Sequence, residues 1–138
     1  LHLVIANTGK TSDTSAVVAD VKKWKEQNPS EFEKIVFDYK QLIENAKKAV
    51  QKSDLKKIGE LMNQNHSLLQ KITVSNETLD SIVAAVRNAG ALGAKMTGTG
   101  RGGLAIALAK NEKDQKQIAT AIQKLGYLTE TTVINGKK

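Results

Sequence analysis

The sequence of 138 residues contains no cysteine, and aromatic residues make up only 4% of it. The absence of cysteine excludes disulfide bonds and thiol catalysis, and it suits the reducing cytoplasm, where we expect this protein to act. No apolar run approaches the length of about 18 residues that a transmembrane helix needs, and no secretory signal is recognisable. We therefore expect no membrane partner.

Arginine is also scarce, because Arg87 and Arg101 are the only arginines among 21 basic residues that give a net charge of +7. The lysines are spread along expected helix surfaces with glutamates between them. A nucleic-acid site typically has a clustered basic strip or aromatic stacking residues. The composition therefore favours a solvated lysine surface over a nucleic-acid partner, and the excess charge would attract polyanionic substrates.

The length and the hydrophobic periodicity predict one domain, residues 1–138, with the element order β-αααα-β-β-α-β. This is the order of the ferredoxin-like split βαβ scheme of α+β proteins, with its first crossover enlarged to four helices. A strand is expected at residues 1–6, the glycine-rich motif is expected to run into a second and a third strand that include 104–109, and a last strand is expected at 127–134. In 104–109, alanine alternates with leucine or isoleucine, so a helix is expected to approach the small face closely.

Capping residues mark the expected helix boundaries. Thr14 stands at the start of the first helix, which Asn28 and Pro29 end, and Ser30 with Glu33 forms a capping box for the second. The later helices are expected to start at Ser53-Asp54, Ser75 and Asn111, with Gly126 ending the last one.

Glycine is concentrated in one segment, where six of the ten glycines lie within residues 90–103. Glycine loses much backbone freedom on folding, so a cluster usually provides positive φ angles or exposes backbone N–H groups to an anion. Lys95, Thr97, Thr99 and Arg101 add donors and charge, which favours a phosphate or carboxylate site. The spacing is neither the dinucleotide fingerprint nor the P-loop, and a glycine-rich hairpin without a ligand is the alternative.

Residues 93–103 read Gly-Ala-Lys-Met-Thr-Gly-Thr-Gly-Arg-Gly-Gly, which closely resembles the third conserved motif of the GHMP kinases. The form of the motif is most similar to that of the members that phosphorylate mevalonate. The resemblance continues through nearly all 138 residues, in order. It includes residues 3–9 with Thr14, the Glu-Leu-Met-Asn-Gln-Asn-His segment at 60–66 followed by Leu68-Leu69, and Val74-Ser75 with Leu79-Asp80.

This resemblance implies a kinase reaction, the ATP- and Mg²⁺-dependent transfer of a phosphoryl group to the 5-hydroxyl of mevalonate. In the family, the Pro-x-x-x-Gly-Leu-x-Ser-Ser-Ala nucleotide loop, the catalytic aspartate and a catalytic lysine lie in the N-terminal half, and this sequence has no such loop. Residues 1–138 are therefore expected to be the GHMP kinase C-terminal domain, with the nucleotide-binding domain absent, no catalytic residue present and no activity alone.

The implied partners are mevalonate, ATP and the N-terminal domain of the same polypeptide, and a homodimer is left open. A phosphomevalonate-phosphorylating enzyme or another GHMP kinase is the neighbouring alternative. The rival from another class is a non-enzymatic ferredoxin-like module that binds a small anion or a partner chain.

The resemblance also implies site residues. The substrate is expected at Thr14, Asn65 and His66. From the residues alone no metal ligand is expected, because His66 and His2 are the only histidines and two histidines without nearby carboxylates do not form a metal site. Arg101 stands where the family varies, and we expect it to face outward and to tolerate substitution. The phosphates are expected at Thr97, Gly98, Thr99, Gly100, Gly102 and Gly103.

From the residues alone, several of these positions have structural alternatives. Thr14 could instead cap its helix, and Asn65 could be a buried structural amide. The acidic residues Asp54, Glu60, Glu77 and Asp80 are expected on caps or polar helix faces, not as general bases.

Overall fold

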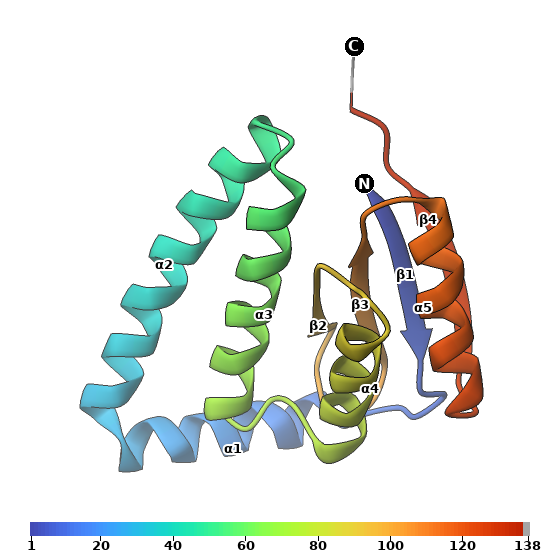
Figure 1. Cartoon of the computed structure of the whole chain (residues 1–138). Coiled ribbons are helices and arrows are strands. Elements are labelled where there is room, and N and C mark those ends of the chain that lie inside the picture. The colour runs from blue at the N-terminus through green and yellow to red at the C-terminus, as the bar shows by residue number, and fades with distance from the viewer. Residues whose placement is uncertain (137–138) are drawn as a thin grey trace.

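The computed structural model describes residues 1–136, in which five helices and four strands follow the predicted order (Figure 1). The four strands form one antiparallel sheet in the order β2-β3-β1-β4. This order and the four helices between β1 and β2 confirm the split βαβ scheme with an enlarged crossover. The elements are β1 (His2–Asn7), α1 (Thr14–Gln27), α2 (Pro29–Gln51), α3 (Leu55–Lys71), α4 (Glu77–Asn88), β2 (Gly93–Thr97), β3 (Leu104–Ala109), α5 (Glu112–Lys124) and β4 (Leu128–Val133).

One face of the sheet is covered by α4 and α5 (Figure 1). The alanines of β3 face this layer, and their small side chains let the two helices approach the sheet as the alternation predicts. The core there includes Ala105, Ala107 and Ala109 of β3 with Val83, Val86, Ile118 and Ile122 of the helices.

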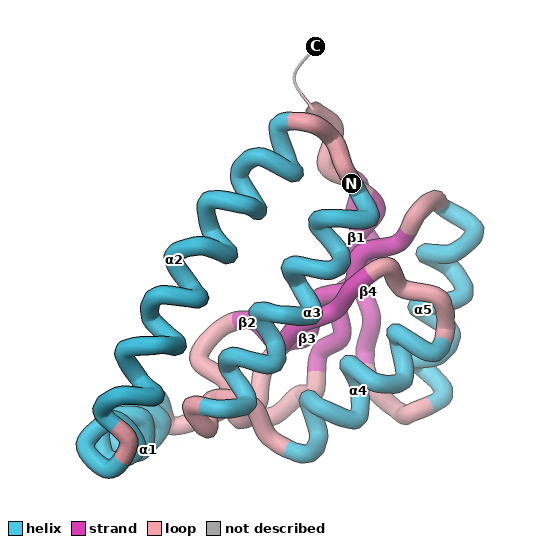
Figure 2. The backbone as a smooth tube through the Cα atoms, turned by 60° about the vertical axis from the view of Figure 1, so that its left-hand side comes forward, coloured by secondary structure: helices cyan, strands magenta, loops and turns pink. Residues whose placement is uncertain are grey.

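Ile106 and Leu108 of β3 belong to a second core, formed with α3 and the long helix α2. These two helices lie side by side (Figure 2). Leu108 of β3 and Leu3 of β1 pack there with Ile58 and Leu61 of α3. Helix α2 packs on α3 as the outer member of the pair. Its predicted apolar face is only partly covered, because Ile35, Leu42 and Ala49 are buried but Val36, Tyr39, Ile43 and Val50 are exposed.

Three predicted helix caps differ from the structure. Asp13, not Thr14, caps α1, where its carboxylate accepts from the backbone of Ser15. The predicted capping box at Ser30 is wrong because α2 already begins at Pro29, whose fixed φ and missing N–H suit a first helical position. Asn76, not Ser75, caps α4.

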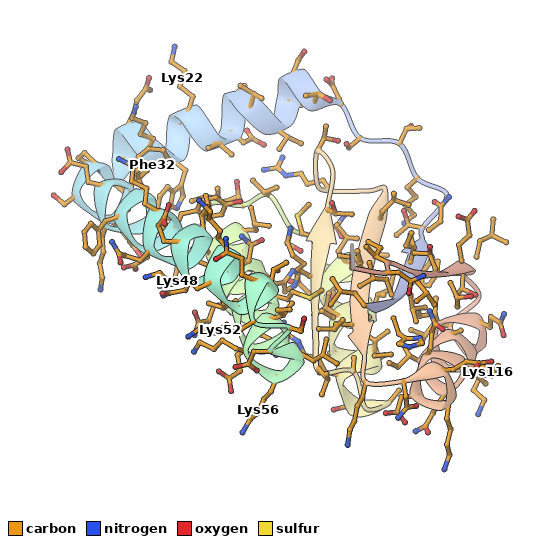
Figure 3. The ribbon with its side chains drawn as sticks, turned by 90° about the horizontal axis from the view of Figure 1, so that it is seen from above. Lys22, Phe32, Lys48, Lys52, Lys56 and Lys116 are labelled. Atoms are coloured by element: carbon orange, nitrogen blue, oxygen red, sulfur yellow. The ribbon has the colours of Figure 1, made fainter. Side chains whose placement is uncertain are left out.

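The caps at Asp54 and Asn111 are confirmed, since both side chains accept backbone N–H groups of their helices. Among residues 1–136, no helix is both long enough and apolar enough to cross a membrane. Figure 3 shows lysines projecting outward from several helices, which supports a solvated and dispersed positive surface. Those labelled are Lys22, Lys48, Lys52, Lys56 and Lys116.

Candidate phosphate and substrate site

The glycine-rich loop, residues 98–103, connects β2 to β3. The expectation that both strands follow the glycine-rich motif is therefore wrong, because β2 is formed by the first five residues of the motif. Gly98, Gly100 and Gly103 have φ angles of +82°, +83° and +71°, a region that favours glycine. Gly100 also packs so tightly that a Cβ would overlap the carbonyl of Val74. Part of the demand for glycine therefore comes from the loop's own packing and not from a ligand.

Some backbone groups of the glycine-rich loop are engaged by the protein. Gly103 donates to the carbonyl of Lys10 at 2.8 Å, and its own carbonyl accepts from the N–H and hydroxyl of Thr8, both at 3.0 Å. These bonds attach the loop to the segment between β1 and α1.

Other backbone donors of the glycine-rich loop remain free. None of the residues that the structure describes accepts a hydrogen bond from the N–H of Gly98, Thr99, Gly100 or Gly102. Successive free N–H groups around left-handed residues are a typical anion-binding arrangement. The loop can therefore bind a phosphate or carboxylate through its backbone.

Thr14 and Thr99 line the same groove, which has a volume of about 340 Å³. Thr14 is exposed, and no described residue hydrogen-bonds to its hydroxyl, because Asp13 provides the helix cap. Thr99 is bonded through its hydroxyl to Ser12. The remaining lining is apolar and consists of Val17, Val18, Val21, Ile72 and Val74. The groove thus combines hydroxyl groups with a hydrocarbon wall.

Thr97 is the last residue of β2, pairs with Leu104 across the sheet, and does not line this groove. The structure therefore separates it from the threonines at 14 and 99.

Arg101 does not face outward, so that expectation is wrong. Its Nε and Nη2 donate to the carbonyl and hydroxyl of Thr73 at 2.9 and 3.0 Å, and its Nη1 pairs with Asp20 of α1. Its charge is therefore neutralised within the protein and is not free for a phosphate.

His66 has no free ring nitrogen for a substrate. Its Nδ1 accepts from the backbone N–H of Met96 at 3.2 Å, its Nε2 lies 3.0 Å from Asp80, and the side chain is 1% exposed. Since Nδ1 accepts, Nε2 carries the proton and donates to the carboxylate. Burial lowers the pKa of His66 below its ordinary value of 6.5, and nearby Arg87 and Lys95 lower it further against the opposing effect of Asp80.

The neighbouring Asn63 was not among the predicted site residues, yet it acts together with His66. Its Oδ1 accepts from the backbone of Ala94 at 3.0 Å. The two side chains, three residues apart on α3, therefore satisfy the outward N–H groups at 94 and 96 of the edge strand β2. Two residues one turn apart on a helix are spaced like two alternate residues of a neighbouring strand. Two polar side chains at this spacing on α3 are the signal that could have revealed the pair.

Asn65 lies in a different place from Thr14 and Thr99. It is 5% exposed and lines a cavity of about 160 Å³ between α2, α3 and β2, together with Lys95. Its Oδ1 has no hydrogen-bond partner among the described residues. Burial lowers the pKa of Lys95, which faces this cavity and not the groove.

Metal-ligating side chains do not gather in the described part of the chain. Within residues 1–136, no three histidine, aspartate or glutamate side chains are placed to hold a metal ion. The candidate site is thus a backbone anion site beside a groove with two threonines.

The family model described as GHMP kinases C terminal matches residues 46–128. The chain is 39% identical to the mevalonate kinase of Pyrococcus horikoshii, over 98% of this chain and 41% of that enzyme. Among solved structures, L. major mevalonate kinase in complex with R-mevalonate is 44% identical, with a TM-score of 0.86 over 90% of this chain and 38% of that one.

A phosphomevalonate kinase from Streptococcus pneumoniae, in complex with phosphomevalonate and AMPPNP, has a TM-score of 0.79 at 20% identity, over 95% of this chain and 39% of that one. This second likeness shows the fold alone. The chain spans about two fifths of the length of the curated relatives, at 41% of the Pyrococcus horikoshii enzyme. The family resemblance in the glycine-rich motif is confirmed, and the chain belongs to the GHMP kinases, matching their C-terminal domain.

Proposed function

We propose that this chain is the C-terminal domain of an ATP-dependent kinase that phosphorylates the 5-hydroxyl of mevalonate. The observation that carries the proposal is the set of free backbone N–H groups at residues 98, 99, 100 and 102 beside the groove of Thr14 and Thr99. The mevalonate kinases among its relatives support the choice of substrate.

Each part of the site has a chemical task. The free N–H groups of the glycine-rich loop bind phosphate oxygens. These groups are uncharged, so they would not form an ion pair with a deprotonated acceptor. The hydroxyls of Thr14 and Thr99 orient the acceptor, whose hydrocarbon part lies on Val17 and Val74. When bound, ATP supplies the γ-phosphoryl group, and most of the catalysis is positioning and charge stabilisation.

The remaining parts are assigned to the N-terminal domain of the whole polypeptide. That domain would supply the nucleotide loop and the acid–base residues that this sequence does not contain. We assign no Mg²⁺ ligand to this chain, because its described residues form no suitable cluster. Residues 1–138 alone should therefore fold without transferring phosphate.

Mevalonate is favoured over phosphomevalonate by the charge of the groove. No basic side chain of residues 1–136 lines it, and the nearby Arg101 is already bonded to Thr73 and Asp20. A phosphate on the acceptor would be expected to need a basic partner at this place.

The test is transfer of labelled phosphate from ATP by the full-length protein, with mevalonate and phosphomevalonate as separate acceptors. We expect transfer to mevalonate only, and none by residues 1–138 alone. Faster transfer to phosphomevalonate would contradict the substrate, whereas phosphate binding without transfer to either acceptor would favour the non-enzymatic anion-binding module.

A further inference from the structure

We propose that Arg101 is a positioning residue that holds α1 against the glycine-rich loop and so fixes the groove between Thr14 and Thr99. The role in substrate binding rests on the proposed kinase function, whereas the hold on α1 does not. Arg101 joins its own loop to two other segments of the chain.

The first segment is the turn between α3 and α4. Arg101 bonds to it three times, through Nε to the carbonyl of Thr73 at 2.9 Å, through Nη2 to the Thr73 hydroxyl at 3.0 Å, and through its backbone N–H to the carbonyl of Val74 at 3.0 Å. A guanidinium fork with two donors on one residue is directionally rigid. The turn therefore fixes the direction of the Arg101 side chain.

The second segment is α1, which Arg101 reaches through Asp20. Helix α1 has little packing of its own. All of it is described, Val17 is its one buried residue, and Val18 is 62% exposed. A helix so weakly packed depends on the polar contacts that attach it.

The attachments of α1 lie on both sides of the groove-lining residues. Ser12, just before the helix, bonds to Thr99, and Asp20, about 9 Å along the helix from Thr14, bonds to Arg101. Thr14 and Val17 lie between these two points and line the groove. Near the other end of α1, Trp24 packs on Phe32 and against the second core, so the Arg101–Asp20 pair adds the direct link between the middle of α1 and the glycine-rich loop.

The backbone at the junction is itself unusual. Arg101 and Thr73 have φ angles of +52° and +67°, which are uncommon for residues other than glycine and least favourable for β-branched threonine. Such conformations persist where surrounding contacts hold them, and they cluster at functional sites. Here the two residues with positive φ angles, Arg101 and Thr73, bond directly to each other.

The test uses the full-length protein and the variant Arg101→Asn. Asparagine tolerates a left-handed φ but is too short to reach Thr73 and Asp20 together. Arg101→Lys keeps the charge and the reach but not the fork. Lys23→Gln is the matched control, because Lys23 lies in the same surface hollow as Asp20 and Arg101 and the change removes one positive charge.

Two readouts separate the hold on α1 from the proposed reaction. In Arg101→Asn, amide hydrogen exchange of residues 14–20 should become faster. The kcat/KM for mevalonate should fall on the order of tenfold to a hundredfold, mostly through KM, while the KM for ATP changes little. Compared with Arg101→Asn, Arg101→Lys should restore part of the exchange protection of residues 14–20 and part of the kcat/KM for mevalonate. Lys23→Gln should match the wild type in both measurements.

Unchanged exchange in residues 14–20 of Arg101→Asn would overturn the hold on α1. Faster exchange with unchanged kinetics for mevalonate would overturn the positioning role. If the wild-type protein transfers no phosphate to mevalonate, the proposed function fails separately, and the exchange experiment still decides whether Arg101 holds α1.

Discussion

Gly59 of α3 lies directly against Gly93 at the start of β2. A Cβ on Gly59 would overlap the backbone of Leu92, and a Cβ on Gly93 would overlap the backbone of Gly59. This close approach brings α3 near enough to the edge strand for Asn63 and His66 to accept its outward N–H groups. The outer edge of β2, the strand that leads into the glycine-rich loop, is thereby hydrogen-bonded to a helix and not to a further strand.

We predict that Gly59→Ala destabilises the chain although it lies within a helix. On an exposed helix surface the change would stabilise by about 1 kcal/mol, but here the methyl group has no room, and overpacking costs about 1–3 kcal/mol. Urea denaturation of residues 1–138 measures the difference. Gln64→Ala, at an exposed position of the same helix, is the control and should change stability little. A more stable Gly59→Ala variant would contradict the packing of α3 on β2.

We predict that His66 makes stability dependent on pH. The pKa of His66 is lowered in the folded chain, so the unfolded chain binds a proton at this residue more readily than the folded chain does. The stability that the neutral His66 contributes is therefore complete above pH 6.5 and decreases as the pH falls below that value. His66→Gln should lower the free energy of unfolding by about 1–3 kcal/mol at pH 8, and this difference should shrink at pH 5. The same measurement on His2→Gln is the control. An equal difference between wild type and His66→Gln at both pH values would contradict the neutral, buried imidazole.

We predict that Gly98 is the cleanest probe of ligand contact in the glycine-rich loop. Among the described residues, apart from its two chain neighbours, no atom lies within 4 Å of a Cβ at Gly98, whereas a Cβ at Gly100 would overlap Val74. Loss of activity in a Gly100 variant would therefore mix ligand contact with misfolding. Gly98→Asn keeps the left-handed conformation but places a side chain where a phosphate is proposed to bind. In the full-length enzyme we expect near-normal thermal stability and a loss in kcat/KM for ATP on the order of a hundredfold.

The control for Gly98→Asn is Gly126→Asn, after α5, which has a φ of +86° and equally open surroundings. It should leave the kinetics unchanged. Normal kinetics in Gly98→Asn would mean that the glycine-rich loop is only a turn, as the alternative interpretation of the sequence held.

The fold was predictable because its signals are local or periodic. The alanine face of β3 and the helical spacing of apolar residues each follow from one segment, and the structure agrees with both. The misplaced caps at Ser30 and Ser75 are one or two residues from the observed N-cap positions, Asn28, whose side chain makes no cap bond, and Asn76. Several capping residues stand close together there, and the backbone selects one by where the helix packs.

The site was less predictable because it depends on contacts between distant segments. Arg101 and Asp20 are 81 residues apart, and no sequence pattern pairs them. His66 lies 30 residues from Met96, and only the position of α3 beside β2 gives its ring a structural task. Thr14 and Thr99 were both predicted for the site, but their shared groove follows from the position of α1.

We propose that Thr14 contacts the acceptor in a kinase that phosphorylates mevalonate. The most direct test is steady-state kinetics of Thr14→Val in the full-length protein, because valine keeps the shape and removes the hydroxyl. The exposed neighbour Thr11→Val serves as the control. We expect that Thr14→Val raises the KM for mevalonate about tenfold and leaves the KM for ATP unchanged, while Thr11→Val behaves as wild type. An unchanged KM for mevalonate in Thr14→Val would contradict this proposal.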